Sequence, residues 1–96
     1  MADVTITRHA NGSGGEYRAA VAGSSVIGRL TWTKQGKVRA ADHTLVPPEI
    51  GGRGIAAKLV EALIADARAQ HFKIDPQCSY VAAAFKRHPE WADLHA

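Results

Sequence analysis

Hydrophobic and polar residues alternate along the first half of the chain, which is the pattern of strands with one buried face. Four segments show this alternation: residues 4–8, 17–21, 26–33 and 38–45. The connections between them are rich in Gly, Ser and Asn; residues 11–15 and Gln35-Gly36 are the clearest turn signals. Short connections favour antiparallel neighbours, so the pattern predicts a four-stranded antiparallel meander.

The hydrophobic period changes after Pro47-Pro48, where proline cannot continue the pairing of a strand. Apolar residues now recur at a spacing of four, and this apolar stripe predicts an amphipathic helix from Arg53 to Gln70. The stripe consists of Ile55, Leu59, Leu63 and Ala67.

A short extended segment, Lys73-Ile74, follows this helix and ends before Pro76. Ser79 is a suitable N-cap for a second helix from Tyr80 to Arg87, which the His88-Pro89 pair ends. The expected order is four strands, a helix, a fifth strand and a helix. A sheet covered by two helices is an α+β fold, or mixed α/β layer.

Composition agrees with a single domain that occupies residues 1–96. Hydrophobic residues make up 46% and charged residues 22% of the chain, which are ordinary fractions for a globular protein. No apolar run approaches the roughly 20 residues that cross a bilayer, and the N-terminal residues do not resemble a secretory signal. The single cysteine, Cys78, cannot form an intramolecular disulfide. These features favour a cytoplasmic protein without a membrane partner.

The formal net charge of +3 suits a polyanionic partner, either a nucleotide cofactor or nucleic acid. Nucleic acid is the weaker candidate, because the chain lacks clustered aromatic residues on a basic sheet face. The five His residues and one Cys lack the spacing of metal ligands, so we expect no metal.

Three glycines lie within four residues between the fourth strand and the first helix, in the segment Gly51-Gly52-Arg53-Gly54. Backbone N–H groups at a helix N-terminus have no intrahelical partner, and the helix dipole adds partial positive charge there. Without side chains in the way, a pyrophosphate could approach these groups, and Arg53 could add a cation. The glycine spacing matches neither a P-loop nor a Rossmann fingerprint. An ordinary tight turn is the alternative interpretation.

The segment Gly51–Ala56 resembles the cofactor loop of GNAT-type N-acetyltransferases, whose pattern is Gln/Arg-x-x-Gly-x-Gly/Ala before an amphipathic helix. Gly54 and Ala56 match that pattern, whereas Gly51 stands where Gln or Arg is usual. Residues 42–56, 73–80 and 87–91 together resemble a minimal subgroup of this family.

The resemblance implies a reduced GNAT fold and an acetyl-CoA site. The fourth and fifth strands would separate, and backbone groups near Leu45 and Val46 would bind the pantetheine arm. The pyrophosphate would lie on backbone amides of the glycine loop and the first helical turn. The implied cofactor-binding residues are thus Leu45, Val46, Gly51, Gly52, Arg53, Gly54, Ile55 and Ala56.

Three residues are candidates for catalysis. Cys78 lies just before a helix, where the dipole lowers the pKa of a thiol, so it could accept the acetyl group or lie beside the thioester. His43, on the fourth strand, could act as the base. The resemblance implies that Tyr80 could protonate the departing CoA thiolate. Packing in or near the core is the alternative role of Cys78 and Tyr80, and His43 could instead be an ordinary surface or core residue.

The leading hypothesis is therefore an acetyl-CoA-dependent N-acetyltransferase acting on an amine. Transfer could be direct with His43 as the base, or could pass through Cys78. Larger GNAT enzymes have helices between their first two strands, so we expect an open acceptor side that suits an amine on a protein. We expect a monomer or weak dimer. The alternative is a non-catalytic module that binds CoA or acetyl-CoA.

Overall fold

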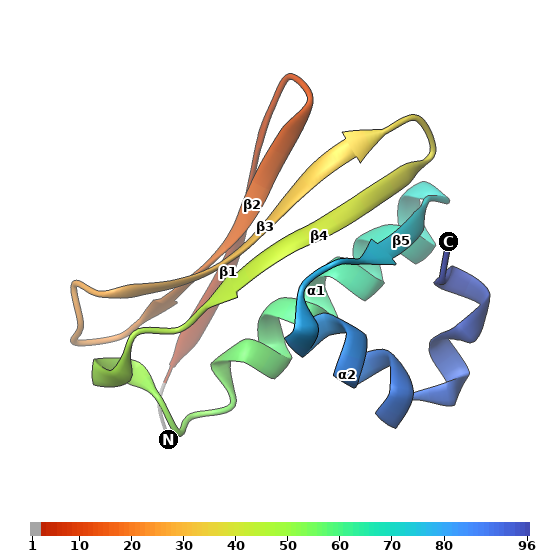
Figure 1. The fold of residues 1–96 in the computed structure, drawn as a ribbon. Helices are drawn as coiled ribbons and strands as arrows, with labels where there is room; N and C mark the ends of the chain where they lie inside the picture. Colours follow the sequence, from red (N-terminus) through yellow and green to blue (C-terminus); the bar gives the residue numbers. More distant parts are fainter. Residues whose placement is uncertain (1–2) are drawn as a thin grey trace.

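A computed structural model describes residues 3–96 and shows one five-stranded sheet with the strand order β1-β2-β3-β4-β5 (Figure 1). The strands are β1 (Val4–Asn11), β2 (Gly14–Val21), β3 (Ile27–Gln35), β4 (Val38–Leu45) and β5 (Lys73–Pro76). Strands β1 to β4 are antiparallel neighbours and β5 pairs with β4 in parallel. The prediction of an antiparallel meander followed by a helix, a fifth strand and a helix is confirmed.

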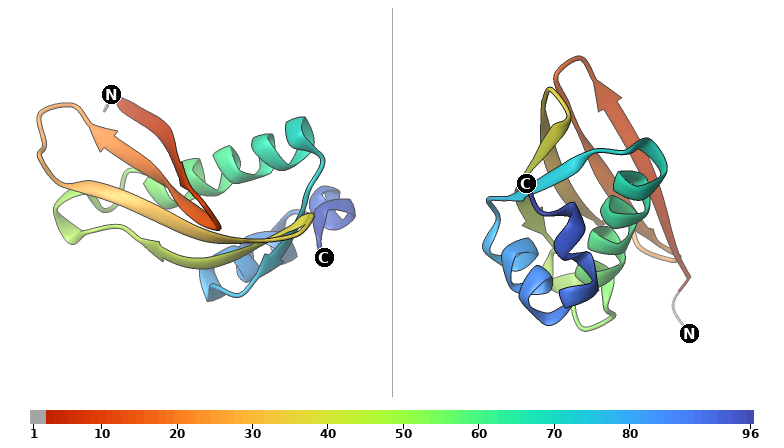
Figure 2. Two further views of the ribbon diagram at one scale, coloured as in Figure 1. Left: turned by 90° about the horizontal axis from the view of Figure 1, so that it is seen from above. Right: turned by 90° about the vertical axis from the view of Figure 1, so that its right-hand side faces the viewer.

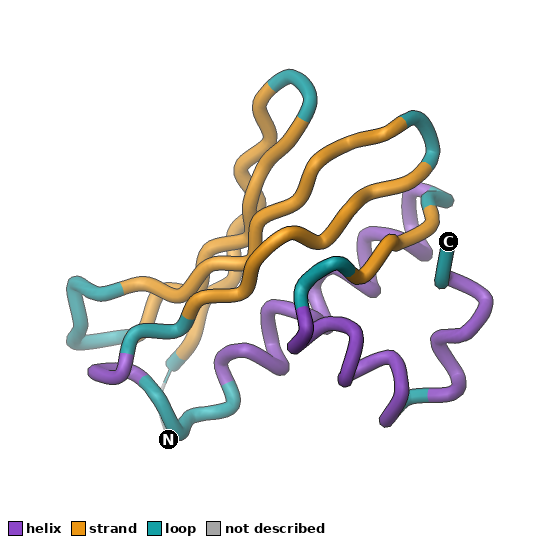
Figure 3. Tube along the Cα trace, in the orientation of Figure 1, coloured by secondary structure: helices purple, strands orange, loops and turns teal. Residues whose placement is uncertain are grey.

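Two α-helices and two short 3₁₀-helices complete the chain, as the tube in Figure 3 shows. They are η1 (Pro48–Ile50), α1 (Ile55–Gln70), α2 (Ser79–Arg87) and η2 (Pro89–Leu94). Helix α1 begins two residues later than expected, because Gly54 is its N-cap and has left-handed backbone angles. The N-cap of α2 is Cys78 rather than the expected Ser79, and no side-chain hydrogen bond caps this helix.

The first turn is tighter than the cluster of small residues suggested. Asn11 and Gly14 face each other as the last pair of β1 and β2, so only residues 12 and 13 form the turn. Gly15 continues β2 opposite Ala10, and an added Cβ at this glycine would lie 2.6 Å from the Trp32 ring. The glycine is therefore a packing requirement of the sheet as well as a sign of a turn.

The core lies between one face of the sheet and both α-helices. The alternation in β2 and β3 buries Tyr17, Leu30 and Trp32 on that face. The apolar stripe of α1 covers them with residues such as Leu59 and Leu63, which are fully buried. Helix α1 packs against β1, β2 and β3, and α2 packs against β4 and β5 (Figure 2). The apolar residues of α2 and η2 join the same cluster.

The opposite face of β1 to β3 carries mostly polar side chains, and within residues 3–96 no helix lies over it (Figure 1). Glu16 is at its centre and forms ion pairs with Arg18 and Arg29. Both contacts between the carboxylate and a guanidinium lower the pKa of Glu16, and the contact with Arg18 has the larger effect. Burial raises this pKa, but by less than the two contacts lower it.

Within residues 3–96, no helix is long and apolar enough to cross a bilayer.

Candidate active site and cofactor loop

Strands β4 and β5 separate halfway along β4. Their pairing ends where Pro76 lies opposite Ala41, whereas β4 continues for four more residues to Leu45. The backbone N–H of Cys78 donates to the carbonyl oxygen of Ala41, at 2.8 Å, and closes the paired region. Beyond that bond no strand of the described chain pairs with this edge of β4, and Figure 1 shows the two segments diverging.

A β-bulge coincides with the separation. Trp32 pairs with Ala41 and Thr31 pairs with His43, so Asp42 is the extra residue on β4. Its carboxylate accepts a hydrogen bond of 2.6 Å from the Thr33 hydroxyl across the pair of strands. A bulge bends a strand and increases its twist, which turns the end of β4 away from the line of β5.

The loop after β4 combines a buried anchor with an exposed glycine segment. Pro48 opens η1, and Ile50 at its end is 1% exposed, so the chain is fixed to the core at that point. The following residues 51–54 are all exposed. Gly52 and Gly54 have φ angles of 74° and 69°, in the left-handed region that favours glycine. Their conformation, and not crowding, requires glycine, because an added Cβ would meet no atom within 4 Å.

This conformation leaves a continuous series of backbone donors without acceptors. Gly51 N–H donates to Pro48, and the next backbone donor with an intrachain acceptor is Lys58 N–H, which bonds to Gly54. None of the six N–H groups from Gly52 to Ala57 has an acceptor within residues 3–96. The first turn of α1 contains no acidic residue that would neutralise the helix dipole. The segment can therefore accommodate an anion.

Cys78 lies where strands β4 and β5 separate. As N-cap of α2 it is half-buried, and its Sγ lies 3.4 Å from the Thr44 Oγ1 on β4. Burial raises the pKa of the Cys78 thiol, but hydrogen bonds from the Thr44 hydroxyl and from backbone N–H groups of Val81 and Tyr80 outweigh that effect. The net result is a pKa below the ordinary value for cysteine, which favours the reactive thiolate form.

His43 does not share this environment. It is exposed and pairs with Thr31, a residue of the polar sheet face, whereas the neighbouring Thr44 contacts Cys78. Within residues 3–96 the hydrogen-bond partner of the thiol is Thr44, and no hydrogen bond joins His43 to Cys78. The structure therefore brings Thr44, and not His43, to the cysteine. The alternation of β4 could not have identified Thr44, because the bulge at Asp42 interrupts that alternation.

Tyr80 lies in the first turn of α2 and is half-buried. Its side chain lines a small cavity of about 30 Å³ between α1 and α2, with Ala57 and Trp91 among the other lining residues. Arg87 lies over its ring at 5.8 Å from the ring centroid. Tyr80 is thus near the first turn of α1, which carries the unpaired N–H groups.

The two residues expected to bind an extended cofactor arm differ in exposure. Leu45 is 62% exposed, and it is the one exposed large hydrophobic residue among residues 3–96. Val46 is half-buried and packs against the core. An exposed leucine at the end of an unpaired strand edge offers apolar surface to a bound ligand.

No group of three or more His, Cys, Asp or Glu side chains with metal-binding geometry occurs within residues 3–96.

Comparison with known proteins agrees with this arrangement. The family model described as GCN5-related N-acetyl-transferase matches residues 16–94, a range that includes the separating strands, the glycine loop and Cys78. The chain therefore belongs to the GCN5-related N-acetyltransferase family. A search of curated proteins finds no match to it.

Proposed function

We propose that this protein transfers an acetyl group from acetyl-CoA to an amine, with the cofactor on the glycine loop and the chemistry beside Cys78. Membership of the GCN5-related N-acetyltransferase family supports acetyl transfer in general. The observation that carries the specific proposal is the series of six unpaired N–H groups, Gly52 to Ala57, next to a strand edge without a partner.

The residues present fit an acyl-CoA. A pyrophosphate would accept hydrogen bonds from the N–H groups of Gly52 to Ala57, at the positive end of the α1 dipole. Arg53, exposed in the same loop, would add a positive charge. The free edge of β4 at Leu45 and Val46 would pair with an amide-containing arm as a further strand would. Bound there, acetyl-CoA supplies an activated acetyl group as a thioester.

The position of Cys78 supports a role close to the acyl carbonyl, and two routes follow from it. In the first, Cys78 thiolate attacks the carbonyl carbon, a new S–C bond forms at Cys78, and the C–S bond to CoA breaks. The amine then attacks the acetyl-cysteine and regenerates the thiol. In the second, the amine attacks the thioester directly, with His43 removing its proton. In both routes the CoA thiolate leaves and takes a proton, for which Tyr80 is the proposed donor.

The exposed polar sheet face supports a protein amine as the acceptor. No helix covers that face within residues 3–96, and His43 and Leu45 on β4 pair with Thr31 and Arg29 of that face. An uncovered surface accommodates a flexible lysine side chain or chain terminus better than it encloses a small metabolite. A binding role without turnover has no specific structural observation in its favour.

The test is acetyl transfer by wild type and by Cys78→Ala, with calorimetric binding of acetyl-CoA measured on both. We expect wild type to bind acetyl-CoA and to acetylate an amine on at least one protein or peptide acceptor. Cys78→Ala should retain binding but lose most turnover. Intact-mass analysis of wild type after incubation with acetyl-CoA alone distinguishes the routes, because one added acetyl group at Cys78 belongs to the two-step route only.

Two matched variants complete the design. Ser13→Ala, an exposed position in the turn between β1 and β2 at the other end of the sheet, should leave binding and turnover unchanged. His43→Gln should reduce turnover in the direct route more than in the two-step route. Absence of acetyl-CoA binding by folded wild type would reject the cofactor proposal. Binding without transfer to any amine would instead support the non-catalytic alternative.

A further inference from the structure

A second charged site lies at the other end of α1, beneath the hairpin that joins β3 and β4. It is a pocket of about 370 Å³ whose lining includes Lys34, Lys37 and Arg39 from the hairpin and Gln70 and His71 from the end of α1. Helix α1 has 16 residues, which corresponds to a length of about 24 Å. The pocket is therefore separated from the glycine loop by the whole helix.

Arg39 has an environment that is unusual for a charged side chain. Its guanidinium carbon lies 4.3 Å from the centroid of the Trp32 ring and 4.0 Å from that of the Phe72 ring. One terminal nitrogen, Nη1, is buried without a hydrogen-bond partner, and the other donates to the neutral Gln70 side chain at 3.3 Å. The two rings thus hold a partly desolvated cation in place, although buried charges are normally paired.

Nothing within residues 3–96 neutralises the positive charge of this pocket. No carboxylate forms an ion pair with Lys34, Lys37 or Arg39, and no acidic residue lines the pocket. These three side chains carry as much positive charge as the formal net charge of the whole chain, +3. Three cations that share one pocket repel each other, and a bound anion would relieve that repulsion.

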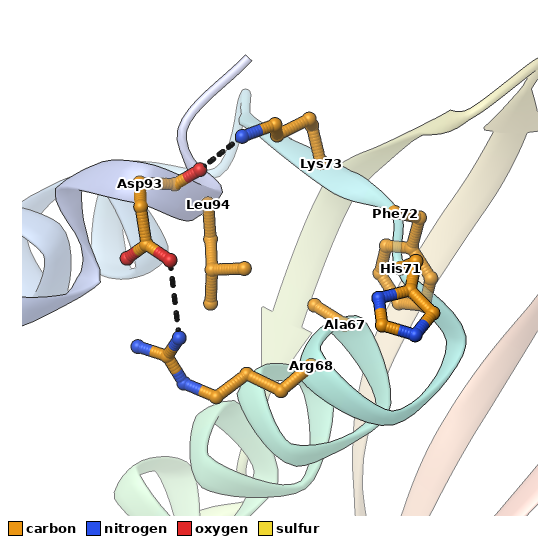
Figure 4. Close-up of a pocket in the computed structure, with 7 residues that line it drawn as sticks. All are labelled: Ala67, Arg68, His71, Phe72, Lys73, Asp93 and Leu94. Carbon is orange, nitrogen blue, oxygen red and sulfur yellow. Dashed lines mark hydrogen bonds and ion pairs between the residues drawn. The ribbon is translucent and has the colours of Figure 1, made fainter.

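The adjoining pocket provides an internal comparison. It shares His71 and Phe72 with the first, but its cation Arg68 is paired with Asp93 at 3.1 Å. Lys73 donates to the backbone carbonyl of Asp93 (Figure 4). Figure 4 shows the Arg68–Asp93 ion pair on the side of the pocket away from His71 and Phe72. Within residues 3–96, Arg68 of the adjoining pocket thus has an acidic partner, whereas Lys34, Lys37 and Arg39 of the proposed pocket have none.

We propose that the pocket formed by Lys34, Lys37, Arg39, Gln70 and His71 binds a small molecule that carries a phosphate monoester. Three positive charges suit a dianion better than a carboxylate, and arginine and lysine are the usual partners of phosphate. The volume of the pocket is in the range of small-molecule sites. This inference is independent of the proposed acetyl transfer, because it involves no residue of the glycine loop or of the region around Cys78.

Backbone amide shifts of the ¹⁵N-labelled full chain, titrated with glucose 6-phosphate at constant ionic strength, test the proposal. We expect saturable shifts at residues 34–39 and 70–73. Lys34→Gln/Lys37→Gln should weaken binding at these positions at least about fivefold, since it removes two charged contacts. Both lysines are exposed, so this variant should remain folded. Lys86→Gln, which removes an exposed lysine outside the pocket, should titrate like wild type.

Inorganic phosphate and acetate serve as comparison probes. Inorganic phosphate should shift the same amides more weakly than the ester, and acetate should not saturate them. Shifts at residues 52–57 report the glycine loop and do not bear on this pocket. The proposal is overturned if glucose 6-phosphate produces no saturable shift at residues 34–39 and 70–73. It is also overturned if acetate is equally effective, or if the double variant binds like wild type.

Discussion

Replacing Gly54 by alanine isolates the backbone conformation that begins α1. Gly54 has a φ of 69° and a ψ of 21°, which an L-residue adopts at a cost of about 1 kcal/mol. An added Cβ at this position would meet no atom within 4 Å, so no steric term adds to the backbone term. We therefore expect Gly54→Ala to lower the free energy of unfolding by about 1 kcal/mol.

Gly51→Ala is the matched control, three residues earlier in the same loop. Gly51 has a φ of −69°, which alanine adopts without strain. Its added Cβ would lie 3.4 Å from the carbonyl oxygen of Pro48, an ordinary van der Waals distance. The free energy of unfolding should change by less than about 0.5 kcal/mol, and reduced chain entropy of the unfolded state could offset part of any loss.

Urea unfolding followed by circular dichroism measures both variants. For a domain of this size, about 1 kcal/mol corresponds to a decrease in Tm of about 4–8 °C. Equal stability losses in the two variants would show that the left-handed conformation of Gly54 is not the cause. A loss above about 2.5 kcal/mol in Gly54→Ala would show a steric conflict that the loop geometry excludes.

Three further substitutions test the sheet and the candidate site. Tyr17→Phe removes the buried hydroxyl that donates to Asp66 at 2.7 Å, and should cost about 1–2 kcal/mol in urea unfolding. Burial, and then the hydrogen bond to that carboxylate, raise the pKa of Tyr17 above its ordinary 10.0; wild type should therefore lose stability as pH rises above about 10, and the variant should show less of this loss. Gly15→Ala places a Cβ 2.5 Å from a backbone carbonyl oxygen of β1, so we expect a loss of about 3 kcal/mol or more, and a Tm within 3 °C of wild type would contradict the packing described. Thr44→Val removes the hydroxyl that stabilises the Cys78 thiolate, so the pKa of Cys78 should rise and alkylation by iodoacetamide at pH 7 should slow. An unchanged alkylation rate would show that Thr44 does not lower the pKa of Cys78.

The sheet and α1 could be predicted because their hydrophobic periods are regular. Alternation in β3 places Gly28, Leu30 and Trp32 on the buried face, as expected, and the four-residue apolar stripe gives α1 to within two residues at its start. The helix start was misplaced because the left-handed angles at Gly52 and Gly54 extend the loop. The hydrophobic pattern alone does not record those angles.

The candidate site was less accessible from the sequence, because it depends on where two strands separate. The bulge at Asp42 interrupts the alternation of β4, so the pattern of that strand could not give the partner of Cys78. The hydrogen bond between Cys78 and Thr44 joins residues 34 positions apart in the chain, and no local signal indicates it. Likewise, η2 was not predicted, although it carries the buried Leu94 against the core.

Titration of the ¹⁵N-labelled chain with acetyl-CoA most directly tests the proposed cofactor site. We expect saturable amide shifts at residues 52–57 and 43–46, with the largest changes at the six N–H groups that lack an acceptor. Residues 34–39, at the far end of α1, should change little. Saturable binding that leaves residues 52–57 unshifted, or no binding by the folded protein, would contradict the cofactor site proposed here.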